Sequence, residues 1–116
     1  MDTLFLLTPG FIDRQDDEQT YYCPDCALIE GVLAYYPRLR QMLDIRYVGY
    51  TRPRKEITAI IGDAFEGCPV LILGDKVPSY MEAKGIKRYG DKFYIDSPNL
   101  VAEYISNRYN VDKPHF

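Results

Sequence analysis

Residues 22–36 read YCPDCALIEGVLAYY, and the expected arrangement of the whole chain follows from them. They come after the apolar run 3–7 (TLFLL), which predicts a short buried strand, and a polar loop. Pro24 suits the first position of a helix, and Asp25 suits its positively charged first turn. Apolar residues then recur at helical spacing until Pro37, at Leu28, Ile29, Val32, Leu33 and Tyr36. The sequence therefore predicts a strand and then a helix whose N-terminus carries two cysteines.

The middle of the chain continues the alternation of strands and helices. Residues 43–47 alternate between apolar and charged side chains, which predicts a second strand. A second helix is expected to begin at Pro53 and to end near Gly62. Its inward-facing residues are expected to be Ile57, Ile60 and Ile61.

Two further strands and a last helix are expected near the C-terminus. The continuous apolar run 70–73 predicts a buried strand, and residues 92–95 predict a shorter strand that forms a hairpin with it. Ser97 is an N-cap residue and Pro98 suits the first helical turn, so the last helix begins there. Its apolar stripe is formed by Leu100, Val101, Tyr104, Ile105 and Tyr109.

Cys23 and Cys26 form a CxxC pair at the start of the first predicted helix. The thiolate is the nucleophile in disulfide exchange, and free backbone amides and the helix dipole stabilise it at such a position. Cys23 would attack a disulfide, and Cys26, one turn inside the helix, would resolve the mixed disulfide. The carboxylate of Asp25 stabilises the helix but disfavours a second negative charge on Cys23. Thiol-disulfide exchange is therefore the first functional hypothesis.

A metal site and an inert structural pair are the alternatives for the same spacing. Cys68 and the lone His115 could complete four ligands with Cys23 and Cys26, although a second CxxC is missing. We therefore expect no bound metal. Cys68 itself could be a second resolving thiol, a metal ligand, a substrate contact or a small buried side chain.

Composition and charge exclude several classes of protein. A chain of 116 residues has the length of one domain, so residues 1–116 are expected to form one. A formal net charge of −3 gives no global field that favours nucleic acid or an anionic membrane. No signal peptide and no run of about 18 apolar residues is visible, so no membrane span is expected. Three cysteines with one close pair fit a reducing cytoplasm rather than a secreted disulfide framework.

Cationic residues are concentrated in the middle of the chain. We expect them to form a solvated polar surface rather than an anion-binding patch. They are Arg38, Arg40, Arg46, Arg52, Arg54 and Lys55.

The motifs carry a resemblance to the thioredoxin superfamily, with glutaredoxins and the N-terminal domain of glutathione S-transferases as the closest branches. Residues 22–26 (YCPDC) resemble the glutaredoxin active site, and residues 68–71 (CPVL) resemble the segment that holds the superfamily's cis-proline. Residues 95–97 (IDS) with the last helix resemble the acidic-Ser step of a transferase N-terminal domain. The pattern also fits an uncharacterised bacterial family with a thioredoxin-like fold.

The resemblance implies a four-stranded mixed sheet flanked by helices. It also implies that Cys23, Pro69 and Ser97 converge on one groove. In the family, the backbone beside the cis-proline pairs with the backbone of glutathione, and the acidic-Ser pair holds its γ-glutamyl end. The resemblance assigns these roles to Cys68, Pro69, Asp96 and Ser97. Tyr22 and Pro24, beside Cys23, are also expected to bind the substrate or glutathione. Independently, a helix N-terminus at Ser97 can bind a carboxylate, and Asp96 can accept a hydrogen bond from an ammonium group.

Two segments depart from a compact glutaredoxin. The loop 8–22 is long enough to reshape or cover the groove, and so is the excursion 74–91, which joins the two hairpin strands and has one expected helical turn near Met81. The helical second domain of the transferases is absent from the sequence, so their electrophile site cannot be carried over.

The sequence thus predicts a thioredoxin-like thiol-disulfide oxidoreductase. Cys23 is the expected nucleophile, Cys26 the resolving thiol and Pro69 the backbone positioner. The expected partner is glutathione or a protein that bears a disulfide, with glutathione as co-substrate and no tightly bound cofactor. The alternative classes are a non-catalytic module that binds glutathione or a peptide in the groove, and a metal protein that uses cysteine ligands. Fold alone does not decide between them.

Overall fold

A five-stranded mixed sheet forms the centre of the protein in the computed structural model, which describes residues 1–14, 18–75, 77 and 84–116. The strand order is β2-β1-β3-β5-β4. Strands β1 and β2 are parallel, and the other neighbours are antiparallel. The strands are β1 (Thr3–Leu7), β2 (Asp44–Val48), β3 (Val70–Ile72), β4 (Lys87–Tyr89) and β5 (Lys92–Ile95).

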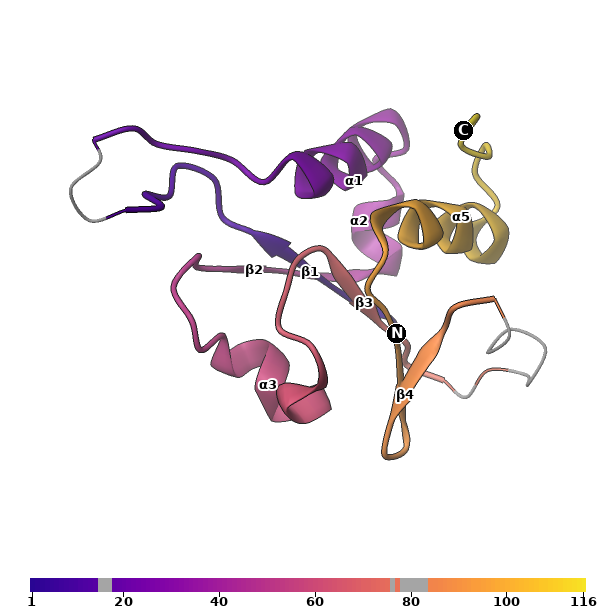
Figure 1. The fold of residues 1–116 in the computed structure, drawn as a ribbon. Coiled ribbons are helices and arrows are strands. Elements are labelled where there is room, and N and C mark those ends of the chain that lie inside the picture. The colour runs from indigo at the N-terminus through magenta and orange to yellow at the C-terminus, as the bar shows by residue number, and fades with distance from the viewer. Residues whose placement is uncertain (15–17, 76, 78–83) are drawn as a thin grey trace.

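Helices cover both faces of this sheet. Figure 1 shows α1 (Pro24–Tyr35) and α5 (Pro98–Tyr109) side by side over one face, where they contact each other, and α3 (Lys55–Ile61) over the opposite face. A short helix, α2 (Leu39–Met42), leads into β2, and a 3₁₀ turn, η1 (Gly62–Ala64), follows α3. None of the helices in the described ranges is both long and apolar enough to cross a membrane.

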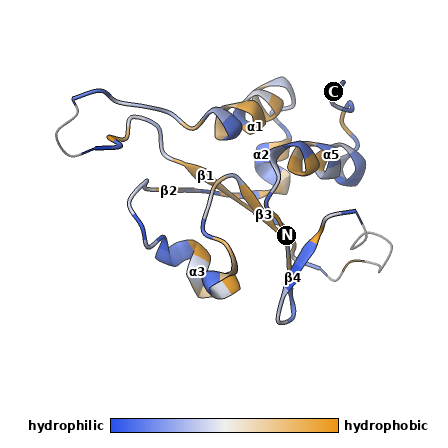
Figure 2. Cartoon of the chain, in the orientation of Figure 1, coloured by the Kyte–Doolittle hydropathy of each residue, from blue (hydrophilic) through white to orange (hydrophobic). Residues whose placement is uncertain are grey.

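The central strands are buried on both faces. Leu4, Phe5 and Leu6 in β1 have no exposed surface, although consecutive side chains in a strand point to opposite faces. All of β3 is buried as well, and both strands are hydrophobic in Figure 2. A strand that is covered by helices on both faces requires such a continuous apolar run rather than an alternating one. Helix α1 contributes Ile29 and Leu33 to this core.

The strand count differs from the expected four because the excursion 74–91 contains β4. All three residues of β4 are exposed, and they read Lys-Arg-Tyr, so no apolar periodicity marks them as a strand. Positive charge on an edge strand is a usual protection against further strand pairing. The helical turn expected near Met81 lies outside the described residues. The other expected strands are confirmed at 3–7, 44–48, 70–72 and 92–95.

A buried carboxylate fastens the N-terminus to the last helix. Asp2 is only 5% exposed and accepts hydrogen bonds from the Gly74 amide (2.8 Å), the Tyr104 hydroxyl (3.2 Å) and the Tyr109 hydroxyl (2.7 Å). Burial, together with the adjacent carboxylate, raises the pKa of Tyr104 to about 12 and raises that of Tyr109 as well. The two tyrosines on the apolar stripe of α5 therefore have a polar role besides packing.

Candidate functional site

Three segments that are distant in sequence meet at one edge of the sheet. In the antiparallel pairs, Phe5 of β1 lies opposite Val70, and Leu71 lies opposite Ile95. The end of β1, the start of β3 and the end of β5 are therefore at the same edge. Residues 68–69 precede β3 and residues 96–97 follow β5, so the sheet register brings both pairs to this edge.

Cys23 occupies the N-cap of α1. Its backbone is extended (φ −79°, ψ 116°), and Pro24 follows as the first helical residue. The Sγ of Cys23 accepts a hydrogen bond from the Cys26 amide at 3.3 Å, so the sulfur satisfies one of the free N–H groups of the first turn. Cys23 is half-buried, while Tyr22, Pro24 and Asp25 beside it are exposed. The thiol is thus accessible and has a backbone donor directed at it.

The loop before β3 lies directly against this thiol. The Sγ of Cys23 donates a hydrogen bond to the backbone oxygen of Cys68, with 3.8 Å between the two atoms. The peptide bond between Cys68 and Pro69 is cis, the isomer that the resemblance implied, and Pro69 is buried. The expected proximity of Cys23 to Cys68 is therefore confirmed.

Cys26 lies behind Cys23 and is 4% exposed. Its Sγ accepts a hydrogen bond from the Leu7 amide at 3.4 Å, which ties α1 to the end of β1. Burial strongly raises the pKa of the Cys26 thiol, and the Leu7 amide counteracts only part of that shift. Thiolate charge on Cys23 or Cys68 would raise it further, so the three thiols are electrostatically linked.

A cavity of about 160 Å³ opens beside the pair. It is lined by Leu7, Pro9, Tyr22, Cys23, Cys26, Ala27, Glu30 and Tyr47. The Tyr47 hydroxyl donates to Glu30 at 2.9 Å, and Arg40 forms an ion pair with the same carboxylate at 3.4 Å. Tyr47 is 46% exposed although strand alternation would suggest an inward position, because its ring lies against this cavity rather than in the core. Glu30 and Tyr47 were not predicted as site residues, because they carry no local motif.

The charges of two arginines, Arg52 and Arg54, act on the Cys68 thiol, and this part of the site was not predicted. Arg54 is only 5% exposed, so the expectation of a solvated surface is wrong for this residue. Burial raises the pKa of the Cys68 thiol to about 11, while the charges of Arg54 and Arg52 lower it. The one available signal was the cluster of cationic residues between 38 and 55.

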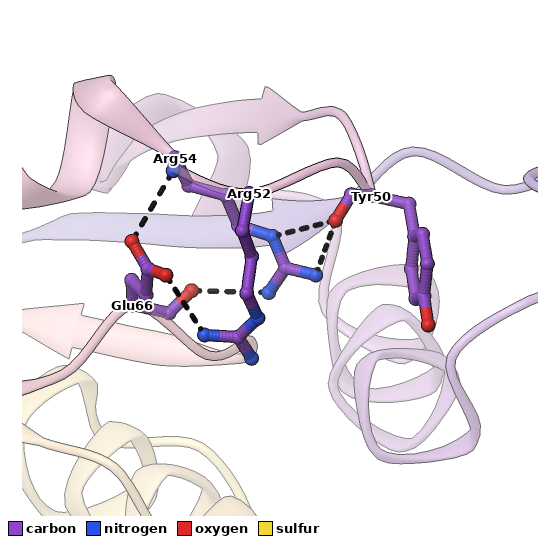
Figure 3. Close-up of polar contacts among 4 residues, drawn as sticks. All are labelled: Tyr50, Arg52, Arg54 and Glu66. Carbon is purple, nitrogen blue, oxygen red and sulfur yellow. Dashed lines mark hydrogen bonds and ion pairs between the residues drawn. The ribbon is translucent and has the colours of Figure 1, made fainter. Parts of the chain in front are cut away.

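Backbone oxygens hold Arg54 in place (Figure 3). Its guanidinium donates two hydrogen bonds to the backbone oxygen of Tyr50, at 2.7 and 3.2 Å, and one to the backbone oxygen of Glu66, at 3.0 Å. The Glu66 carboxylate instead accepts from the Arg54 amide at 3.3 Å and pairs with Arg52 at 3.1 Å. Within the described ranges no carboxylate forms an ion pair with the Arg54 guanidinium. Its positive charge is consequently available to the neighbouring thiol.

Asp96 and Ser97 begin α5 as predicted, but Asp96 already has a cationic partner. Lys87 on β4 donates to the Asp96 carboxylate at 2.8 Å. Ser97 is the N-cap residue, yet its hydroxyl makes no capping hydrogen bond. The extra strand thus supplies a cation at the position that the resemblance assigns to a ligand ammonium group.

The described residues of the loop 8–22 contact Tyr50, which follows β2. Phe11 stacks on Tyr50 with 4.4 Å between ring centroids, and the Tyr50 hydroxyl donates to Asp13. A backbone bridge joins Phe11 to Tyr21, just before the cysteines. A cavity of about 560 Å³ lies here, lined by Ile12, Asp13, Tyr50, Thr51 and Arg52. Residues 11–13 of the loop therefore lie close to Tyr50 and Arg52.

The cysteines and His115 were considered above as possible metal ligands. In the part of the chain that it describes, no three His, Cys, Asp or Glu side chains are arranged to hold a metal ion. Cys23, Cys26, Cys68 and His115 therefore do not form the ligand set that sequence spacing allowed.

Comparison with known proteins gives a family without an assigned activity. Searches of curated proteins and of solved structures found no match. A family model described as "Protein of unknown function (DUF3088)" matches residues 1–113, which is nearly the whole chain. The protein belongs to the DUF3088 family of proteins of unknown function.

Proposed function

We propose that this protein is a thiol-disulfide oxidoreductase with a thioredoxin-like fold, in which Cys23 is the nucleophile. The strand order β2-β1-β3-β5, with one parallel pair and helices on both faces, supports that fold, and β4 is an addition at its edge. The observation that carries the proposal is the environment of Cys23. This half-buried thiol accepts a hydrogen bond from the Cys26 amide at a helix N-terminus, and it lies against the loop that enters β3.

The proposed reaction has two exchange steps. The thiolate of Cys23 attacks one sulfur of a substrate disulfide, so a mixed disulfide forms at Cys23 and one substrate thiol leaves. The thiolate of Cys26 then attacks the Cys23 sulfur, which releases the second thiol and leaves a Cys23–Cys26 disulfide. Two electrons pass from the protein to the substrate, and an external thiol must reduce the protein again. The Cys26 amide that now points at the Cys23 sulfur can stabilise the attacking anion.

Glutathione is the proposed small-molecule partner. The backbone at Cys68 and Pro69 would pair with its backbone, and Ser97 at the start of α5 would receive its carboxylate. Asp96 would accept its ammonium group only after the Lys87 ion pair opens, because that pair occupies the carboxylate. Tyr22 and Pro24 would flank the bound sulfur, since both are exposed beside Cys23.

A non-catalytic binding module is the second candidate. The buried position of Cys26 favours it, because the raised pKa of that thiol disfavours the thiolate that resolution requires. In that case the same groove would hold glutathione or a peptide without chemistry.

Trapping the mixed disulfide separates the two candidates. The double variant Cys26→Ser/Cys68→Ser, which retains only Cys23, is reduced, incubated with glutathione disulfide and analysed by intact mass. The oxidoreductase proposal expects one glutathione per chain at neutral pH, at a rate well above that of the same protein unfolded in urea. The Cys23→Ser/Cys26→Ser/Cys68→Ser variant, which differs only at Cys23, is the matched control. Reaction of the folded protein that is no faster than that of the unfolded chain would refute a catalytic Cys23.

A further inference from the structure

We infer that Cys68 is a second resolving thiol, which displaces the substrate from Cys23 by forming a Cys23–Cys68 disulfide. This inference rests on the proposed oxidoreductase function and assigns a role to a residue outside the CxxC motif. It predicts that the site uses three thiols rather than two.

Proximity is the first argument. The backbone oxygen of Cys68 is 3.8 Å from the Cys23 sulfur. Standard backbone dimensions place the Cys68 Cα within about 2.8 Å of that oxygen, so it lies within about 6.6 Å of the sulfur. A disulfide requires Cα atoms about 4.4 to 6.8 Å apart, whereas the bound of about 6.6 Å reaches only the Cys23 sulfur and not its Cα. Formation of the bond therefore requires this loop to move towards α1.

Exposure is the second argument. Cys68 is half-buried, in the loop before β3, whereas Cys26 is 4% exposed and its sulfur is engaged by the Leu7 amide. A substrate held at Cys23 therefore has Cys68 on the loop that the resemblance assigns to substrate binding and Cys26 on the core side. The two cysteines thus belong to different elements of the fold, both of which lie against Cys23.

Charge is the third argument. The buried Arg54 guanidinium donates only to backbone oxygens, and Arg52 lies next to it in the same cluster. Burial raises the pKa of the Cys68 thiol, and both positive charges oppose that shift and so favour the thiolate. Negative charge on Cys23 raises the pKa of the Cys68 thiol. A mixed disulfide at Cys23 removes this charge. Formation of the mixed disulfide thus promotes ionisation of the thiol that would resolve it.

The resolving step balances without a further reactant. The Cys68 thiolate attacks the Cys23 sulfur, the bond between Cys23 and the substrate breaks, and the substrate leaves as a thiolate. The oxidant is the substrate disulfide, and the product is an intramolecular disulfide that an external thiol such as glutathione can reduce.

The test compares two variants that differ only at Cys68. Reduced Cys26→Ser and reduced Cys26→Ser/Cys68→Ser are each treated with one equivalent of glutathione disulfide, quenched with acid, and analysed by intact mass and peptide mapping. Circular dichroism first checks that both variants are folded. The inference expects the double variant to keep its glutathione, whereas Cys26→Ser loses it and yields a peptide pair that joins Cys23 to Cys68.

Each other outcome points to a specific failure. Glutathione that persists on both variants would overturn the role of Cys68 and leave the proposed function intact. A double variant that acquires no glutathione would overturn the proposed function and this inference together. Loss of glutathione from Cys26→Ser without a Cys23–Cys68 peptide pair would also overturn the inference.

Discussion

The sulfur of Cys23 lies 3.8 Å from the backbone oxygen of Cys68, which brings two thiols that are 45 residues apart into one site. The contact joins the N-terminus of α1 to the loop that enters β3. Both elements are fixed by the sheet, because β1 and β3 are direct neighbours in it. The chemistry of this site therefore depends on the surroundings of both cysteines.

The arginine cluster should control the ionisation of Cys68. We expect Arg52→Gln to raise the pKa of Cys68 above its value of about 11, because the substitution removes a positive charge that lowers it. The pH dependence of Cys68 alkylation in a Cys23→Ser/Cys26→Ser background measures this. Lys55→Gln, which removes an exposed cation from the start of α3, is the matched control. An equal shift in both variants would contradict the role of Arg52.

The ion pair between Lys87 and Asp96 should compete with glutathione. We expect Lys87→Met to lower the KM for glutathione several-fold, because Asp96 is then free to accept the ligand ammonium group. Asp96→Asn should raise the same KM, because it removes the acceptor. Reduction of a glutathione mixed disulfide under steady-state conditions measures both values. Changes of the same sign in the two variants would place glutathione elsewhere.

The carboxylate of Asp2 should be a major contributor to stability. Asp2→Ala removes the acceptor of three hydrogen bonds at a buried position, and buried donors left without a partner are costly. We expect a loss of about 2–4 kcal/mol in the free energy of unfolding. Urea denaturation measures it, and Asp91→Ala, at an exposed turn, is the control. A loss no larger than in the control would show that these bonds contribute little.

Alkaline pH should destabilise the protein through the tyrosines around Asp2. The pKa of Tyr104 is raised from 10 to about 12, so between these pH values the folded protein keeps a proton that the unfolded chain has lost. Stability is then fully present below about pH 10 and falls as the pH rises towards 12. Tyr104→Phe should reduce this fall, which thermal unfolding at a series of pH values measures. An unchanged slope in the variant would contradict the assignment.

Much of the fold follows from patterns that the sequence displays directly. The continuous apolar runs at β1 and β3 indicate strands buried on both faces, and the proline after each N-cap residue marks the start of α1 and α5. β4 lacks such a signal, because an exposed edge strand of Lys, Arg and Tyr is stabilised by backbone pairing and not by burial. The short α2 also lacks an apolar periodicity that would predict a helix, since only Leu39 is buried in it.

Some residues of the candidate site could likewise be predicted from the sequence, and others could not. Cys23 and Cys26 are visible as a motif, and the cis-proline segment could be placed only through a family resemblance. The cationic residues were visible in the sequence, but the burial of Arg54 was not, because it depends on bonds to the backbone oxygens of Tyr50 and Glu66 that exist only in the folded chain. Likewise, the partner of Asp96 comes from the strand that the sequence did not indicate.

The most direct test of a redox-active dithiol is the reduction potential of the Cys23–Cys26 pair. The Cys68→Ser protein is equilibrated in glutathione buffers of defined ratio, its free thiols are trapped by alkylation, and the oxidised fraction is read by mass. We predict a reversible two-electron transition between roughly −270 and −120 mV, the range spanned by known dithiol oxidoreductases, and its loss in Cys23→Ser/Cys68→Ser. A pair that stays reduced in every buffer, or a transition that persists without Cys23, would contradict the account.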